Sequence, residues 1–187
     1  MAHRLGRMAW VTHETTTVYA NAWISVREDR VTGPAGEGIY GVVTMRQPAV
    51  FVIALDEQDR MCLVTLERYT TGRSIEVPAG GSDGEDPLLA ARRELLEETG
   101  YEAAEWTPLG TMNALNGIAD APEHVFLARG LTLATGAAST SQEEEGIDAV
   151  SWVPFGEVLD MIADGRISDG ETVAAVAYAG IRLGRFR

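Results

Sequence analysis

Apolar and polar side chains alternate over residues 9–47 with the period of two that is typical of β-strands. Ile24 and Val26 fall on one side of this alternation, and a turn rich in glycine and proline at 33–36 divides the segment. We therefore expect residues 1–47 to form a small antiparallel β-sheet unit.

A continuous apolar run from Ala49 to Leu55 follows, which suits a central strand buried on both faces. Four polar residues at 56–59 separate it from a second apolar run, Met61 to Leu66. This spacing is typical of a β-hairpin, so we expect the two runs to pair with each other. Further strands are predicted near 106–113, 123–130 and 147–153.

Residues 86–99 are predicted to form a helix. Asp86 can cap the first turn, Pro87 suits the first helical position, and Gly100 suits the C-terminal end. Four leucines fall within one arc of about 120° and are expected to bury this helix against the sheet: Leu88, Leu89, Leu95 and Leu96.

Two more helices are predicted, over 154–165 and about 171–183. Strands and helices mix without a regular βαβ alternation, which indicates the α+β class. We expect two parts, an N-terminal unit at 1–47 and a larger domain at 48–187.

The charge balance limits the partners of the chain. Fifteen basic residues face 28 acidic ones, which gives a formal net charge of −13. This argues against nucleic acid or an anionic membrane as the main partner, because both bind basic surfaces. All fifteen cations are arginines, which excludes a P-loop lysine and a Schiff-base lysine, so an anionic substrate would need a metal to bridge it.

The cysteine content and the hydropathy give the expected location. Cys62 is the single cysteine and cannot form an internal disulfide. The first residues lack an apolar signal core, and no apolar run approaches the ~18 residues of a membrane span. We expect a cytoplasmic protein.

Three glutamates gather on one face of the predicted helix 86–99. Glu94 and Glu98 are four residues apart, and Glu97 lies beside them. Like charges at this spacing repel unless a cation is bound, and hard oxygen ligands suit Mg²⁺, with Mn²⁺ as a substitute. The simpler alternative is a solvated acidic helix face, since exposed glutamate is common in helices.

The residues around these glutamates resemble the Nudix box, G-x5-E-x7-R-E-U-x-E-E-x-G-U. The segment 80–101 contains the glycine-rich loop, the acidic helix and its glycine end. One departure is that the loop before Glu85 is one residue short, which places Ala79 in the glycine position and predicts an altered loop geometry. The positions that match are Glu85, Arg93, Glu94, Glu97, Glu98 and Gly100.

The resemblance implies a Nudix α/β/α sandwich with a mixed β-sheet and a site that hydrolyses a diphosphate linkage. It implies that Glu94 and Glu98 are the main metal ligands, with Glu97 as an additional ligand. It also implies that the carbonyl of Ala79 is a backbone ligand and that Arg93 orients the glutamates.

The segments on either side of the box are similar to those of ADP-ribose pyrophosphatases. The stretch from Arg68 to Gly80 is similar to their segment before the box. In that group Arg68 and Glu76 would lie near the terminal ribose or the base, with Gly80 and Gly81 also contacting substrate. A surface ion pair between Arg68 and Glu76 is the alternative.

The general base is usually supplied by an acidic loop after the box, which here is most like residues 142–147. Glu144 or Glu145 is the expected base, against the alternative of a solvated acidic turn. The N-terminal strands are similar to those that pair two subunits in the same group, so a homodimer is expected.

The resemblance implies an enzyme that hydrolyses a nucleoside diphosphate sugar, with ADP-ribose giving AMP and ribose 5-phosphate as the first choice. The alternatives are a hydrolase of another nucleotide sugar or of a dinucleotide, a Nudix-fold sensor that binds such ligands without cleaving them, and an acidic scaffold. The choice of sugar is open because Asn116 and Gly117 occupy the place where ADP-ribose enzymes tend to have a proline.

Overall fold

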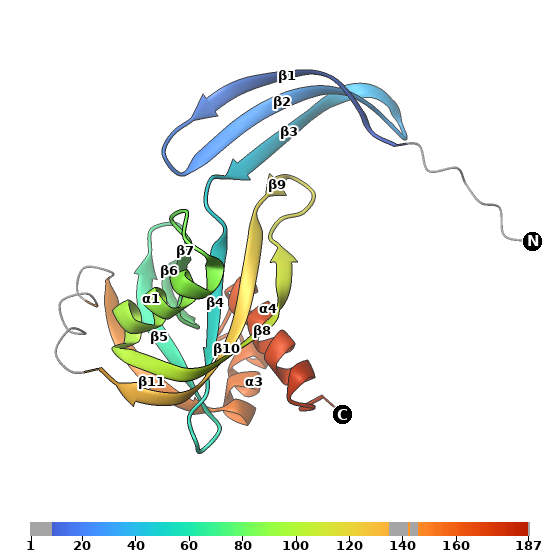
Figure 1. Ribbon diagram of the computed structural model, residues 1–187. Helices are drawn as coiled ribbons and strands as arrows, with labels where there is room; N and C mark the ends of the chain where they lie inside the picture. Colours follow the sequence, from blue (N-terminus) through green and yellow to red (C-terminus); the bar gives the residue numbers. More distant parts are fainter. Residues whose placement is uncertain (1–8, 135–141, 143–145, 187) are drawn as a thin grey trace, which may run out of the picture. The chain divides into compact units, whose positions relative to one another are not determined.

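The computed structural model divides the chain into two compact units (Figure 1). The residues that it describes are 9–134, 142 and 146–186. The first unit comprises the chain up to Arg46 together with Asn113–Ala121, and the second comprises Gln47–Met112 and the chain from Pro122 onward. The segment 113–121 lies within the range that the sequence assigned to the larger domain, and strand pairing is the reason that it joins the first unit.

The first unit is a four-stranded sheet. Its strands, in spatial order, are β1 (Val11–Ala20), β2 (Ile24–Gly33), β3 (Gly36–Met45) and β9 (Ala119–Asp120). β1, β2 and β3 are antiparallel, and the short β9 runs parallel to β3. A two-residue turn joins Gly33 to Gly36, and Gly36 has a φ of 104°, which favours glycine. The antiparallel N-terminal unit predicted from the alternation is thus present in the fold.

In the described residues of the second unit, the strands form two sheets and the helices with assigned bounds are α1, α3 and α4. One sheet has the order β7-β4-β10-β8, and the other has the order β11-β5-β6. The strands are β4 (Ala49–Ala54), β5 (Arg60–Arg68), β6 (Gly72–Glu76), β7 (Ala79–Gly81), β8 (Tyr101–Asn113), β10 (Pro122–Leu133) and β11 (Ile147–Pro154). The helices are α1 (Pro87–Thr99), α3 (Phe155–Ala163) and α4 (Gly170–Arg182).

The central strands β4 and β10 are buried on both faces. They run parallel to each other, whereas β7 is antiparallel to β4, so this sheet is mixed. Alternate residues of β4 enter two hydrophobic clusters, Phe51 and Ile53 with α3 and α4, and Val50 and Val52 with α1. The result is an α/β/α sandwich, which confirms the predicted fold class. None of the described helices is both long and apolar enough to cross a membrane.

The predicted hairpin between the runs at 49–55 and 61–66 is wrong. Both runs are strands, but β4 pairs with β7 and β10 whereas β5 pairs with β6 and β11. A single bridge between Leu55 and Met61 joins them. β4 pairs with β10 and β5 pairs with β11, both distant in the sequence, and the local pattern does not encode such pairing.

Candidate active site on the acidic helix

Helix α1 begins and ends where the sequence predicts. The Asp86 side chain accepts a hydrogen bond of 2.9 Å from the backbone N–H of Leu88, and Pro87 is the first helical residue. Gly100 ends the helix with a φ of 77°, in the left-handed region that glycine adopts without strain.

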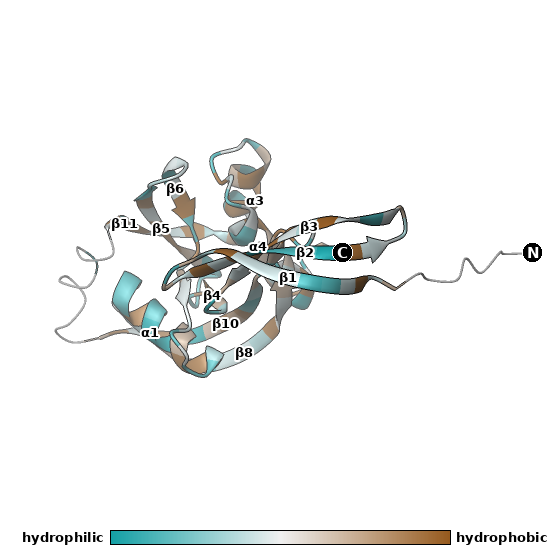
Figure 2. Ribbon diagram, turned by 90° about the horizontal axis from the view of Figure 1, so that it is seen from above, coloured by the Kyte–Doolittle hydropathy of each residue, from teal (hydrophilic) through white to brown (hydrophobic). Residues whose placement is uncertain are grey.

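The face that α1 buries differs from the expected one. Leu95 is fully buried, but Leu89 is 55% exposed, and Leu88 and Leu96 are only partly buried. The buried face instead carries Ala90, Ala91, Leu95, Glu94 and Glu98. The prediction that the leucine arc forms the packing surface is therefore wrong. Two alanines let the helix approach β4 closely, with the carboxylates turned inward. Figure 2 shows the hydropathy of each element.

Two of the three glutamates lie against β7. Glu98 is 4% exposed, and its Oε2 accepts a hydrogen bond of 2.9 Å from the backbone N–H of Ala79. Glu94 is 6% exposed, and a Cβ added at Gly80 would lie 2.3 Å from its carboxyl group. The absence of a side chain at Gly80 thus gives the Glu94 carboxylate the space that it occupies.

Arg93 connects the box residues. Its Nε donates to Glu85 at 3.0 Å, its Nη1 donates to Glu94 at 2.8 Å and to Glu97 at 3.0 Å, and its Nη2 donates to the carbonyl oxygen of Gly81 at 2.8 Å. Partial burial disfavours the charged guanidinium, but these carboxylates outweigh it and raise the pKa of Arg93 above its ordinary value. One guanidinium therefore holds the loop before α1 and two of the three glutamates together.

The donor atoms on this face of α1 suit a divalent metal, although the side chains are not arranged around a common metal position. Glu94, Glu97, Glu98 and the carbonyl of Ala79 are all hard oxygen donors. Within the described ranges, no group of three or more His, Cys, Asp or Glu surrounds a common metal position. Arg93 contacts one oxygen of Glu94 and one oxygen of Glu97, so its guanidinium orients two of these donors.

Two backbone hydrogen bonds hold the shortened loop, one to the residue before β4 and one within the loop. The N–H of buried Ser82 donates to the carbonyl of Pro48, and the N–H of Glu85 donates to the carbonyl of Ser82, both at 2.8 Å. Asp83 and Gly84 have φ values of 49° and 82°. Gly84 therefore supplies the permissive backbone expected of this loop, and one non-glycine residue shares its left-handed conformation.

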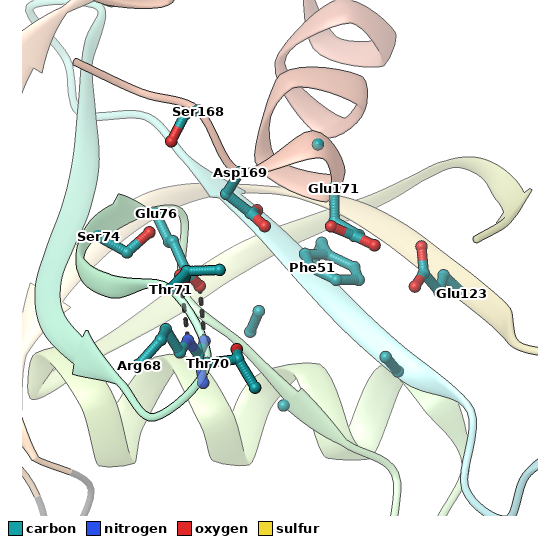
Figure 3. Close-up of a pocket in the computed structure, with 14 residues that line it drawn as sticks. Phe51, Arg68, Thr70, Thr71, Ser74, Glu76, Glu123, Ser168, Asp169 and Glu171 are labelled. Carbon is teal, nitrogen blue, oxygen red and sulfur yellow. Dashed lines mark hydrogen bonds and ion pairs between the residues drawn. The ribbon is translucent and has the colours of Figure 1, made fainter. Parts of the chain in front are cut away.

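A pocket of about 540 Å³ lies beside β7 in the second unit (Figure 3). Ala79 and Gly80 form part of its wall, and Arg68 and Glu76 contribute side chains from β5 and β6. Arg68 Nη2 contacts Glu76 Oε2 at 2.6 Å, and Nε binds the other oxygen at 3.0 Å. Glu76 is only 5% exposed, whereas the Arg68 side chain is 44% exposed, so the pair lies at the pocket wall with its guanidinium open to solvent.

The opposite part of the pocket contains acidic residues to which the sequence gave no role. They are Glu123 on β10 and Asp169 and Glu171 at the start of α4 (Figure 3). Burial, followed by the charges of Glu171 and Asp169, raises the pKa of Glu123 to about 7. The available signal was an acidic residue two positions before the apolar run Val125–Ala128 of a central strand, where glutamate is uncommon.

The other predicted residues have different positions. Gly81 holds Arg93 through its carbonyl and is absent from the pocket lining, unlike Gly80. Glu144 and Glu145 lie outside the described residues. Gln142, just before them, donates from its side chain to the carbonyl oxygen of Glu98 at 3.0 Å.

The buried thiol of Cys62 lies behind the acidic helix. Burial, with a smaller effect from the charge of Glu98, raises its pKa to about 12. A thiol with such a pKa stays protonated at neutral pH, so Cys62 acts as a core residue and not as a nucleophile.

Comparison with known proteins gives the family. A NUDIX domain matches residues 45–176, and a nucleoside diphosphate sugar hydrolase N-terminal domain matches residues 10–43. The methanol dehydrogenase activator of Bacillus methanolicus is 34% identical over 169 residues, which cover 89% of this chain and 90% of that protein. The ADP-ribose pyrophosphatase of Mycobacterium tuberculosis is 34% identical over 173 residues, which cover 91% of this chain and 80% of that protein.

One further sequence relative and one solved structure are also similar to this chain. The GDP-mannose pyrophosphatase of Escherichia coli O1:K1 / APEC is 34% identical over 108 residues, which cover 58% of this chain and 56% of that protein. The crystal structure of an ADP compounds hydrolase has a TM-score of 0.82 at 20% identity, covers 97% of this chain and 98% of its own, and shows the same fold. The resemblance drawn from the box and its flanks is confirmed, and the chain belongs to the Nudix hydrolase family.

Proposed function

We propose that this protein hydrolyses the diphosphate linkage of a nucleoside diphosphate sugar, with ADP-ribose as the first candidate and AMP and ribose 5-phosphate as products. The observation that carries the proposal is the buried acidic face of α1, tied together by Arg93 and packed on β7 beside a pocket. The names of the relatives from M. tuberculosis and E. coli, an ADP-ribose and a GDP-mannose pyrophosphatase, support this substrate class.

Nudix hydrolases generally use divalent metal ions. We propose Mg²⁺ here, with Mn²⁺ as a substitute, held by Glu94 and Glu98 with help from Glu97 and the Ala79 carbonyl. When bound, the cation would neutralise charge on the diphosphate and make a water molecule more acidic. This neutralisation lets a protein with a net charge of −13 accept a polyanion.

The remaining residues orient the glutamates, line the pocket or accept a proton. Arg93 fixes Glu94 and Glu97 by hydrogen bonds, and Arg68 presents a guanidinium held by Glu76 at the pocket wall, where Gly80 also lies. We assign the general base to Glu144 or Glu145, which accepts the proton of the attacking water. The water oxygen bonds to one phosphorus while the bridging P–O bond breaks, which releases two monophosphates.

A substrate panel tests the proposal. We expect the purified protein with Mg²⁺ to cleave ADP-ribose faster than GDP-mannose, UDP-glucose or a dinucleoside polyphosphate, and chelation of the metal to abolish turnover. Product analysis by chromatography, with isotope-labelled water, identifies the bond that breaks. Tight binding of ADP-ribose without any product would favour a sensor, and faster cleavage of GDP-mannose would change the preferred substrate.

We also propose that the first unit pairs two subunits. All ten residues of β1 are exposed, and the unit carries exposed apolar side chains such as Trp23 at 72% and Ile39 at 71%. Apolar stretches lie along β3 and a hydrophilic stretch along β1 (Figure 2). A small sheet with exposed apolar residues is marginal alone and typical of an interface.

Light scattering tests the pairing directly. We expect the mass of a homodimer, twice 20.1 kDa, at micromolar concentration. Trp23→Glu places a charge on the exposed surface without disturbing the core, and it should shift the mass toward the monomer. A wild-type monomer over the whole concentration range would contradict the proposal.

A cytoplasmic location is proposed on the cysteine content. The chain has one cysteine, Cys62, and it is buried as a free thiol. A protein that relies on no disulfide is compatible with a reducing compartment.

A further inference from the structure

The carboxylate of Glu123 is the most unusual polar group in the pocket. Glu123 lies near the start of β10, opposite Ala49 of β4, and is 7% exposed. Its Oε2 has no hydrogen-bond partner among the residues that the structure describes. A buried polar atom without a partner is costly, so such an atom in a native protein calls for an explanation, such as a functional role or a bound water or ion.

Other negative charges face the same part of the pocket. Figure 3 shows Glu171 and Asp169 at the start of α4, with Glu171 beside Glu123 and both on the other side of Phe51 from the Arg68–Glu76 pair. All three acidic residues line this one pocket. Among the described lining residues Arg68 is the one cation, and Glu76 holds it.

The chemistry of this acidic end excludes some ligands. A phosphate would be repelled by the three acidic groups, because Arg68, the cation of the described lining, is already ion-paired with Glu76. The three also fall outside any metal-holding group in the described ranges, so a second metal site is not indicated. What fits is an uncharged group that donates hydrogen bonds, since a carboxylate accepts strongly from hydroxyls.

We propose that Glu123, together with Asp169 and Glu171, forms a subsite for the hydroxyl groups of the sugar that the diphosphate joins to the nucleoside. The diphosphate would lie toward Ala79, Gly80 and Arg68, and the sugar would extend past Phe51 to the carboxyl group of Glu123. The pocket volume of about 540 Å³ accommodates a sugar phosphate. This inference rests on the proposed function and adds which part of the substrate the pocket selects.

The test compares two substrates that differ in their hydroxyl groups. ADP-ribose carries the sugar, and the ethyl ester of ADP has the same diphosphate linkage without it. The KM and kcat of both are measured with Mg²⁺ at pH 8 for the wild type, for Glu123→Gln and for Glu105→Gln. Glu105 is an exposed residue of β8 outside the pocket and serves as the matched control.

We expect Glu123→Gln to lower the ratio of the KM of the ethyl ester to that of ADP-ribose by about tenfold, because a charge-assisted hydrogen bond to the sugar is lost. Glu105→Gln should keep the wild-type ratio. An unchanged ratio in Glu123→Gln, whether the two KM values stay or rise together, would overturn the subsite. If the wild type cleaves neither substrate nor GDP-mannose, the proposed function fails first and the subsite falls with it.

Discussion

Replacement of Glu98 with glutamine is expected to lower kcat for a nucleotide sugar by at least about a hundredfold, while the fold stays intact. Loss of a group that supports a metal only indirectly commonly costs 10- to 100-fold, and loss of a ligand should cost at least as much. Glu98 is 4% exposed and accepts the N–H of Ala79 at 2.9 Å. Glutamine keeps an acceptor oxygen for that N–H but removes the negative charge that a cation requires.

Steady-state kinetics over a Mg²⁺ titration, with thermal unfolding of the same samples, make the measurement. A ligand role predicts a lower kcat and a higher Mg²⁺ requirement at an unchanged melting temperature. Glu105→Gln removes an equal charge from an exposed position of β8 and should leave both kinetic values as they are. Wild-type turnover in Glu98→Gln would refute the ligand assignment.

The sequence predicts the elements whose signals are local. The cap by Asp86, the first-position Pro87 and the terminal Gly100 act within one turn of the helix, and α1 has the predicted bounds. The same holds for the apolar strand β4, whose alternate residues enter two clusters because both faces are covered.

The errors come from long-range choices. The hairpin prediction used the short turn at 56–59, but β4 pairs with β10 and β5 pairs with β11, which are distant in the sequence. The leucine arc counted hydrophobic side chains, whereas α1 packs through small alanines and turns Glu94 and Glu98 inward. The hydrophobic periodicity of a segment predicts whether it is a helix or a strand, but it does not determine which other segment it packs against or pairs with.

The two ends of the pocket also differ in how far apart their residues lie in the sequence. Arg68 and Glu76 are eight residues apart on two adjacent strands of one hairpin. The register places Arg68 opposite Gly72 and Glu76 opposite Val64, so their long side chains close the remaining distance. Glu123 and Glu171 are far apart in the chain. They meet because β10 runs parallel to β4 and α4 packs on the same strand, which requires the complete fold.

The second prediction with a large expected effect is a pH-dependent change in stability caused by the raised pKa of Glu123. Its pKa in the folded protein is about 7 against an ordinary value of 4.5, because burial and the charges of Glu171 and Asp169 disfavour its ionised form. The folded state thus holds a proton that the unfolded state releases between these two values. The stability linked to neutral Glu123 is complete below pH 4.5 and is lost as the pH rises through about 7.

Glu123→Gln, which stays neutral, should therefore raise the free energy of unfolding relative to wild type by about 3 kcal/mol at pH 8 and by less than about 1 kcal/mol at pH 5. Urea unfolding in the presence of a chelator measures this difference for the protein alone, with Glu105→Gln as the control that should follow wild type. Parallel pH profiles for wild type and Glu123→Gln would contradict the burial argument. A variant that gains stability at pH 8 while losing discrimination for the sugar would indicate that the protein keeps a costly buried carboxylate because its substrate binds to it.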